Sequence, residues 1–274
     1  MSLLAIIILN YNSWQDTLKE VELCHSTFCI PYNDIIVIDN ASKNEAHEKL
    51  SEASADKFKY IQNKVNSGYA AGNNIGLRYA KESGYKYAWV LNNDIEFPDE
   101  NLVQRILDVF TKDNRIAAVN SDVFAPDGHM FNRDVKRPSF FDFTFGVYAY
   151  RKKGREIEDK GNYGYIYRPQ GCSMFLDLKK MDEINYFDEN TFLYWEENIL
   201  AERLLNKGYK CACCTLTRVI HNHSKTVKSS FDKKKIMKIN NKSFSYYLRE
   251  YRNFPCIAVK LAVLFNTLKL IIID

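Results

Sequence analysis

Three polar residues, Asn92, Asn93 and Asp94, follow an apolar run that extends from Ala88 to Leu91. A short apolar run that stops in this way is typical of a buried parallel strand. Because ligands of open α/β sheets bind at the carboxyl ends of the strands, Asp94 would lie where a metal ion or a phosphate group binds. The same three residues would also suit a simple turn. Other strand ends must decide between the two interpretations.

A second acid ends a second apolar run, since Ile35 to Ile38 leads directly into Asp39 and Asn40. An acid at the tip of an early strand can accept a hydrogen bond from a ribose hydroxyl or from a base N–H. A solvated turn acid would give the same pattern. Because another acid, Asp94, also ends a strand, we favour the ligand interpretation.

Asn10 and Asn12 follow the first apolar run, Leu3 to Leu9. The loop after this run contains no glycine. This argues against a dinucleotide-binding fold, whose pyrophosphate needs glycine at the first strand–helix turn. A nucleotide bound here would contact the side chains of Asn10 and Asn12 instead.

Glycines recur every four residues at Gly68, Gly72 and Gly76, and Asn73 lies among them. This spacing lets the backbone approach a ligand closely. A helical pattern follows, so we expect a loop that becomes a helix, and helix N-termini attract phosphate. A tight contact between this helix and the sheet is the alternative.

Two adjacent acids, Glu196 and Glu197, open a helical pattern that Gly208 closes. Acids in a first helical turn stabilise the helix dipole, but a carboxylate at the rim of a cleft can also act as a general base on a hydroxyl group. His221 and His223 end the last apolar strand pattern. Their spacing of two residues places both imidazoles on one face of the strand. They could be metal or phosphate ligands, or ordinary exposed histidines.

The elements that must position these residues alternate between strand and helix over residues 1 to about 120, which predicts an α/β fold with a mostly parallel sheet flanked by helices. Residues 120 to 170 are rich in aromatic residues and poor in periodicity. We expect loops and short antiparallel strands there that line a cleft. Ser13 with Asp16, and Ser42 with Glu45, have the spacing of helix-capping boxes.

Composition narrows the class of protein. A net charge of +4 over 274 residues does not indicate nucleic-acid binding, and the apolar start lacks the basic region and cleavage site of a secretory signal. The seven cysteines have no disulfide spacing, which favours the cytoplasm. Cys211, Cys213 and Cys214 precede His221 as in some zinc sites, but strand alternation would point Cys213 and Cys214 to opposite faces, so we favour reduced core thiols.

Residues 226–274 form a basic and amphipathic tail that we expect to be helical. Lys225 to Lys242 contains seven lysines and one acid, and the following apolar stretch is interrupted by Lys260 and Asn266. The stretch is too polar to span a bilayer. A basic segment beside an amphipathic helix fits peripheral contact with the anionic inner face of the cell membrane, although the helix could instead pack on the domain.

In this order the motifs resemble the family 2 glycosyltransferases of GT-A (Rossmann-like) fold, especially the bacterial rhamnosyltransferase-like, capsule and O-antigen branch. The resemblance covers about residues 3 to 225. It also includes Gly171-Cys172-Ser173 and the helix that ends at Gly208-Tyr209. It implies a domain over residues 1–225, with a nucleotide-sugar half at 1–120 and a small antiparallel acceptor half at 121–225.

The resemblance further implies an inverting transfer from a nucleoside diphosphate sugar to a hydroxyl of a glycan or lipid-linked acceptor in surface polysaccharide synthesis. Asp39 would hold the base or ribose, and Asp94 would bind Mn²⁺ or Mg²⁺ as the last residue of a D-x-D element. His221, rather than His223, would lie near the metal. The remaining implied donor-binding residues are Asn10, Asn12, Asn40, Gly68, Gly72, Asn73, Asn92 and Asn93.

Glu197 matches the acid that deprotonates the acceptor hydroxyl, with Glu196 beside it. The chain departs from the family pattern at Asn92, where the first acid of D-x-D is usual, and at Glu197 and Ile199, where the family usually has Asp. The departure at Asn92 predicts weak metal binding without the diphosphate. A sugar nucleotidyltransferase, or a sugar- or membrane-binding module without enzymatic activity, are the alternatives.

Overall fold

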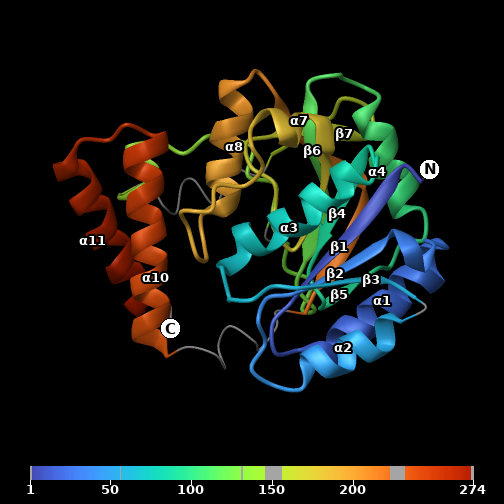
Figure 1. The fold of residues 1–274 in the computed structure, drawn as a ribbon. Coiled ribbons are helices and arrows are strands. Elements are labelled where there is room, and N and C mark those ends of the chain that lie inside the picture. Colours follow the sequence, from blue (N-terminus) through green and yellow to red (C-terminus); the bar gives the residue numbers. More distant parts are fainter. Residues whose placement is uncertain (1, 56, 131, 146–155, 223–231, 273–274) are drawn as a thin grey trace.

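A single sheet forms the centre of the computed structural model, which describes residues 2–55, 57–130, 132–145, 156–222 and 232–272 (Figure 1). The strand order is β3-β2-β1-β4-β8-β6-β9-β5, with β7 paired to β9. The strands are β1 (Leu4–Asn10), β2 (Ile35–Asp39), β3 (Lys59–Gln62), β4 (Tyr87–Leu91), β5 (Ile95–Glu96), β6 (Ile116–Phe124), β7 (Tyr163–Ile166), β8 (Ser173–Asp177) and β9 (Lys210–His221).

The first half of the sheet is parallel, as the sequence predicted. β1 pairs in parallel with β2 and β4, and β2 pairs in parallel with β3. The strands β2 and β4 are buried along their whole length because helices cover both faces. The register places Asn10 opposite Asp39, so the polar ends of β1 and β2 meet at one edge of the sheet.

Helices cover both faces of this sheet. The helices α1 (Trp14–Phe28), α2 (Ala46–Ser54) and α4 (Leu102–Phe110) pack on one face. The helices α3 (Gly68–Glu82), α7 (Leu178–Glu183) and α8 (Glu196–Asn206) pack on the other. In β1, Ile6 and Ile8 belong to the first layer and Ile7 to the second, which is the alternation that a doubly covered strand requires.

The second half of the sheet contains the antiparallel strands expected from the sequence. β8 runs antiparallel between β4 and β6, and β7 and β5 are antiparallel to β9. Cys213 and Cys214 of β9 lie in different core layers as free thiols, so the alternation that argued against zinc is confirmed.

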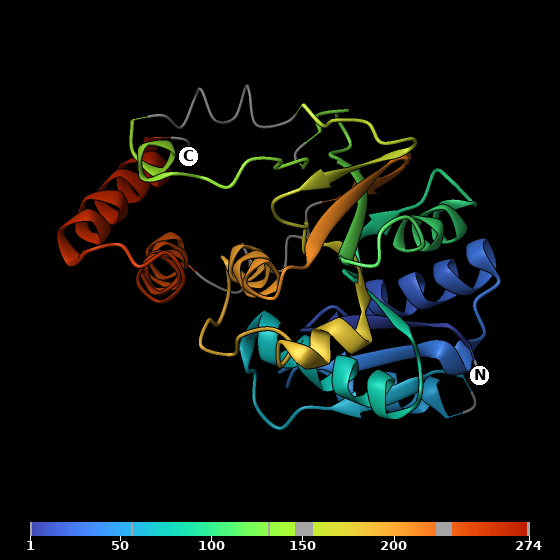
Figure 2. The ribbon, with the colours of Figure 1, turned by 90° about the horizontal axis from the view of Figure 1, so that it is seen from above.

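The C-terminal segment forms a helical hairpin beside α8 (Figures 1 and 2). It consists of α10 (Lys233–Tyr246), a short π-helical turn η2 (Tyr247–Tyr251) and α11 (Cys256–Ile272). Phe244 and Leu248 are buried in a core cluster that also includes Ile199 of α8 and is joined by the short helix α5 (Phe140–Phe143). No helix within the described ranges is long and apolar enough to cross a membrane.

Hydrogen bonds also fix this hairpin to the domain. The hydroxyl of Tyr167 donates to buried Glu202 at 2.7 Å and lies 2.9 Å from the hydroxyl of Tyr247. Asp188 accepts hydrogen bonds from Tyr246 at 2.8 Å and from Tyr251. The tail therefore packs on the domain, which was one of the two possibilities left by the sequence.

Both predicted capping boxes are wrong. Ser13 precedes α1 but makes no capping hydrogen bond, and α2 is preceded by Glu45 rather than by Ser42. The hydroxyl of Ser13 accepts a hydrogen bond from Asn93, and that of Ser42 donates to Asp39. Hydrogen bonds to residues at the strand ends therefore take the place of the predicted caps.

Candidate active site

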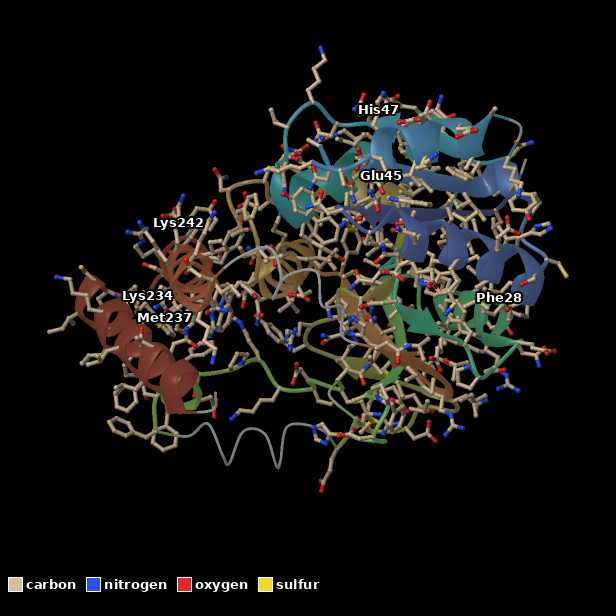
Figure 3. All side chains as sticks on the ribbon, turned by 90° about the horizontal axis from the view of Figure 1, so that it is seen from below. Phe28, Glu45, His47, Lys234, Met237 and Lys242 are labelled. Atoms are coloured by element: carbon tan, nitrogen blue, oxygen red, sulfur yellow. The ribbon has the colours of Figure 1, made fainter. Side chains whose placement is uncertain are left out.

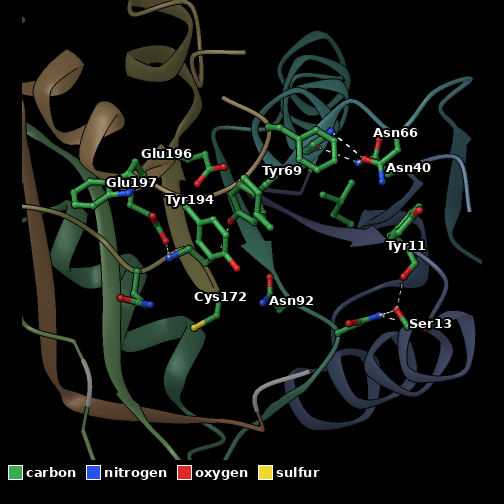
Figure 4. Close-up of a pocket in the computed structure, with 18 of the residues that line it drawn as sticks. Tyr11, Ser13, Asn40, Asn66, Tyr69, Asn92, Cys172, Tyr194, Glu196 and Glu197 are labelled. Atoms are coloured by element: carbon green, nitrogen blue, oxygen red, sulfur yellow. Dashed lines mark hydrogen bonds between the residues drawn. The ribbon is translucent and has the colours of Figure 1, made fainter. Parts of the chain in front are cut away.

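A cleft of about 320 Å³ opens along the polar edge of the sheet (Figure 4). Figure 4 shows Glu196, Glu197 and Tyr194 at one end, Asn40 and Asn66 at the other, and Tyr69 between them. Of the residues predicted from sequence, those that line the cleft are Asn40, Gly68, Asn92, Asn93, Glu196, Glu197 and His221. Asn10, Asn12, Asp39, Gly72, Asn73 and Asp94 lie outside this lining.

Asp39 is fully buried at the end of β2, directly before Asn40 of the cleft. Its Oδ1 accepts hydrogen bonds from the Asn10 amide at 2.9 Å and from the Ser42 hydroxyl at 2.5 Å. Its Oδ2 has no hydrogen-bond partner among the described residues. A buried polar atom without a partner requires an explanation, and a hydrogen-bond donor on a ligand would satisfy this oxygen.

The asparagines around Asp39 hold loops together. The Asn40 amide donates to the Gly68 carbonyl at 3.0 Å, and its Oδ1 accepts from Asn63 at 3.0 Å. Asn12, at φ +58°, accepts a hydrogen bond from the Lys43 N–H at 2.7 Å. These contacts fix the loops at this end of the cleft, where Asn40 also forms part of the lining.

The glycines divide into two roles. Gly68 begins α3 with φ +86°, and a Cβ there would lie 2.1 Å from the Phe192 carbonyl oxygen. A Cβ on Gly72 or Gly76 would instead collide with aliphatic side chains of β1, so these two glycines allow α3 to pack on the sheet. Asn73 donates to the Tyr69 carbonyl within α3 at 3.0 Å, while its buried Oδ1 is unsatisfied within the described chain.

Asp94 lies between β4 and β5, next to His221 at the end of β9. The antiparallel pairing of Ile95 with His221 brings these two segments together. Nε2 of His221 is 3.2 Å from Oδ1 of Asp94, and both side chains are about nine-tenths buried. Neither carboxylate oxygen of Asp94 has a hydrogen-bond donor among the described residues. His223 lies outside the described residues.

Asn92 and Asn93 differ in their contacts. The Asn93 amide donates to the hydroxyls of Ser13 and Thr17 at 2.9 and 2.8 Å, which ties the loop after β4 to α1. Asn92 donates its backbone N–H to the Cys172 carbonyl at 2.9 Å, and the residue lines the cleft.

Glu20 of α1 is an acid that sequence reasoning missed. It is 3% exposed, and its carboxylate accepts a hydrogen bond from the Ile95 N–H at 3.4 Å. Burial raises its pKa well above the usual range, and the negative charge of Asp94 raises it further. An acid at the buried face of an amphipathic helix was the available signal.

Glu196 and Glu197 have different surroundings at the start of α8. Oε1 of Glu197 accepts a hydrogen bond from the Gly171 N–H at 3.1 Å. Glu196 is 5% exposed, and its Oε1 has no hydrogen-bond partner within the described ranges. Burial, reinforced by the negative charge of Glu197, raises the pKa of Glu196 to about 8. The protonated form of Glu196 is therefore favoured over that of an exposed glutamate.

Two residues in the left-handed conformation directly precede Glu196 and position the start of α8 at the cleft. Tyr194 and Trp195 both have φ +72°, which is unusual for bulky residues. The indole of Trp195 stacks on Phe244 with centroids 4.2 Å apart and on Tyr247 at 5.5 Å. The C-terminal hairpin thus supports the strained turn.

Tyr69 and Gly171 were also not predicted from the sequence as functional residues. The Tyr69 hydroxyl donates to the Gly171 carbonyl at 2.6 Å. A Cβ on Gly171 would lie 2.7 Å from Oε1 of Glu197, so any side chain there would displace this carboxylate from its present position. The Gly171-Cys172-Ser173 motif was visible in the sequence, but its contact with Glu197 spans 26 residues and required the fold.

The residues at Asp94 suit a divalent cation. Mg²⁺ and similar ions are commonly bound by one or two carboxylates together with substrate phosphates. The unsatisfied oxygens of Asp94 and the adjacent imidazole of His221 provide such an incomplete set. Among the described residues, no group of three or more His, Cys, Asp or Glu forms a complete metal cage.

The polar ends of parallel strands thus lie at the edge of the sheet where open α/β folds bind ligands, and the cleft there also contains Glu196 and Glu197. The model of glycosyl transferase family 2 matches residues 5–178. The chain belongs to this family and is a glycosyltransferase enzyme.

Two curated relatives act in glycan synthesis. The low-salt glycan biosynthesis hexosyltransferase Agl10 of Haloferax volcanii is 26% identical over 220 residues, covering 80% of this chain and 67% of the relative. The O-antigen chain rhamnosyltransferase WbaN of Salmonella anatum is 24% identical over 203 residues, covering 73% and 60%. This chain thus spans about two thirds of their lengths.

Solved structures share the fold. GalNAc-T7 with UDP, GalNAc and Mn²⁺ aligns with a TM-score of 0.61 at 17% identity, covering 96% of this chain and 54% of the other. The mannosyltransferase PcManGT of Pyrobaculum calidifontis, with GDP-Man and Mn²⁺, aligns with a TM-score of 0.60 at 12% identity, covering 97% and 69%. At these identities the likeness supports the GT-A fold alone, and the predicted fold class is confirmed.

Proposed function

We propose that this protein transfers a hexosyl or deoxyhexosyl group, with inversion, from a nucleoside diphosphate sugar to a hydroxyl of a growing surface glycan. The observation that carries the proposal is the pair Glu196–Glu197, which lines the same cleft as His221 beside Asp94. The cleft thus combines a candidate base for the acceptor with candidate ligands for a diphosphate. The hexosyltransferase and rhamnosyltransferase relatives support the sugar class.

Glu197 is the proposed general base. Burial and the neighbouring Glu197 raise the pKa of Glu196, which favours the protonated form of that residue and makes it the weaker candidate for the base. The hydrogen bond from the Gly171 N–H fixes one carboxylate oxygen and leaves the other for an acceptor hydroxyl. A base must be held within hydrogen-bond reach of the proton that it removes.

The reaction is a single displacement. The acceptor oxygen forms a bond to the anomeric carbon, while the bond between that carbon and the diphosphate oxygen breaks. The hydroxyl proton passes to Glu197, and the nucleoside diphosphate leaves with the bonding electrons. Glu197 therefore has to be ionised at the start of each turnover.

The donor-side roles follow from the strand ends. Asp39, with its unsatisfied Oδ2, is proposed to accept a hydrogen bond from the base or ribose. Asp94 and His221 would hold a Mn²⁺ or Mg²⁺ ion, which when bound would neutralise charge on the leaving diphosphate. Asn10 and Ser42 keep Asp39 oriented throughout.

The acceptor is proposed to be a glycan or a lipid-linked oligosaccharide. The proposed compartment is the cytoplasm, where the free thiols of all seven cysteines would remain reduced. The division into a nucleotide-sugar half and an acceptor half stays a prediction.

Glu197→Gln tests the base assignment. The amide can still accept from the Gly171 N–H, so nucleotide-sugar binding should persist, while transfer should fall by about 10²–10⁴-fold. Glu196→Gln is the matched control, because it resembles the protonated acid already present, and its transfer rate should remain within a few-fold of wild type. Binding is measured by calorimetry and transfer by nucleoside diphosphate release.

Normal turnover of Glu197→Gln would overturn the assignment. A large loss confined to Glu196→Gln would move the base to that residue. Release of pyrophosphate from a nucleoside triphosphate would point instead to a sugar nucleotidyltransferase.

A further inference from the structure

The outer face of α11 carries an exposed apolar stripe. Ile257, Leu261, Leu264 and Leu268 are 72%, 45%, 53% and 47% exposed. Their spacing of four, three and four residues places them on one side of the helix. The opposite side is buried, with Val259 and Ala262 in the cluster shared with α8 and α10.

This stripe belongs to a helix that is fixed in place. The Asn266 amide donates to the side-chain oxygens of Asn240 and Asn241 on α10 at 2.9 and 2.8 Å. Asn241 in turn donates to Thr267 at 2.8 Å. The inner face of α11 is therefore bound to α10, and the stripe is a stable surface of the folded chain.

Other exposed apolar side chains gather at the same end of the molecule. Phe141 and Phe145 are 58% and 72% exposed, and the ring of Phe145 lies 4.8 Å from that of Phe265 on α11. Six of the ten large exposed apolar residues in the described part of the chain belong to this surface. Contiguous apolar exposure of this kind marks an interaction site.

The partner helix α10 contains most of the basic residues of the hairpin. Figure 3 shows Lys234 and Lys242 extending from α10. The other exposed lysines of this helix are Lys233, Lys235 and Lys238. From Asp232 to Leu268 the hairpin contains eight basic and two acidic residues, whereas the whole chain has a net charge of +4, so the hairpin is the positive part of the molecule.

We propose that the α10–α11 hairpin docks on an anionic lipid bilayer, with the α11 stripe inserted at the level of the headgroups and the α10 lysines facing lipid phosphates. An amphipathic helix next to a lysine cluster has the two features that bind such an interface. Self-association through the stripe would bring two lysine-rich helices close together, and the repulsion between them favours the lipid surface instead.

Docking would also place the active site near the bilayer. The hairpin stacks directly on Trp195, the residue before Glu196. Under the proposed function, on which this consequence rests, a lipid-linked acceptor would reach the cleft without leaving the membrane. The docking itself depends only on the hairpin.

Vesicle flotation of the full chain tests the proposal. Wild type should float with vesicles of phosphatidylcholine containing about 30% phosphatidylglycerol, much less with phosphatidylcholine alone, and less in high salt because counterions screen surface charge. Leu261→Gln with Leu264→Gln should lower binding at least tenfold. Leu205→Gln with Leu216→Gln is the matched control, since these leucines are 44% and 49% exposed on α8 and β9.

Charge is tested in the same assay. Replacing Lys234, Lys238 and Lys242 by Gln should weaken binding to the anionic vesicles, whereas replacing the exposed Lys19, Lys112 and Lys207 should have little effect. No flotation of wild type, or equal flotation of the stripe variant, would overturn the proposal. So would a dimer in solution that the stripe variant converts to a monomer.

Failure of docking can be separated from failure of the glycosyltransferase proposal. The stripe variant should keep wild-type binding of nucleoside diphosphate with Mn²⁺. Conversely, Glu197→Gln should float as wild type does. A stripe variant that also loses nucleotide binding would show that the stripe acts through folding, which counts against a docking surface.

Discussion

Neighbouring carboxylates can carry different protonation states when their surroundings differ. Glu197 receives a backbone N–H and faces the cleft, while Glu196 is buried without a hydrogen bond to Oε1. Because like charges this close oppose double ionisation, one proton remains on the pair near neutral pH. Burial favours the protonated form of Glu196.

The raised pKa of Glu196 predicts a pH-dependent stability. Burial and the charge of Glu197 raise the pKa of Glu196 to about 8 from the ordinary 4.5, so between these values the native state holds a proton that the unfolded chain has released. Stability should therefore fall as pH rises from about 5 to about 8, by up to about 1 kcal/mol per pH unit, and then level off.

Thermal unfolding of Glu196→Gln against wild type measures this effect. The wild-type melting temperature should decline relative to the variant between pH 5 and pH 8. The exposed Glu48→Gln serves as control and should follow wild type. Parallel curves for wild type and Glu196→Gln would contradict the assigned protonation state.

At the scale of elements, α3 shows how glycine spacing serves packing as well as the site. Its first residue, Gly68, has a positive φ and lines the cleft. One turn later Gly72 meets Leu9, and another turn later Gly76 meets Ile7 and Ile38. The first glycine of the repeat therefore borders the cleft, and the next two allow α3 to pack closely on the sheet.

Gly76→Ala distinguishes packing from helix propensity. Alanine in a helix is ordinarily more stable than glycine by roughly 1 kcal/mol. Here its Cβ would lie 2.6 Å from Cγ2 of Ile7 and 2.7 Å from Cδ1 of Ile38, so overpacking should dominate and destabilise the fold by about 1–3 kcal/mol. Urea unfolding provides the measurement. A gain in the free energy of unfolding would show that α3 can shift away from the sheet.

At the scale of the whole molecule, the cleft joins segments that are distant in the chain. Its lining extends from Leu9 to His221, and the helix that carries the acids is supported by the C-terminal hairpin. Ligand binding to such a site should stabilise the entire fold, because only the native state assembles it.

Asp94→Ala tests this linkage. For wild type, Mn²⁺ with a nucleoside diphosphate at about 100 times the dissociation constant should add about 3 kcal/mol, or roughly 5 °C in melting temperature. Asp94→Ala should lose most of the Mn²⁺-dependent increase, and Mn²⁺ alone should have little effect on either protein. Equal shifts for wild type and Asp94→Ala would remove the metal role from Asp94.

The sequence by itself determined the parallel core and the position of the polar strand ends. Apolar runs of strand length that stop at Asn10, Asp39 and Asn92 have few other stable arrangements, because buried parallel strands must be apolar on both faces. The order of the motifs was sufficient for the family. The contents of the cleft could thus be named in part before the fold was known.

Only the tertiary structure decided which of those residues face the cleft and which hold it together. Asn93, Ser13 and Ser42 have side chains that suit caps or ligands equally well, and long-range hydrogen bonds show that they hold the loops together. The different surroundings of Glu196 and Glu197 depend on Gly171 and on burial. Such contacts join residues that are far apart in the sequence, so they cannot be predicted from local pattern and spacing.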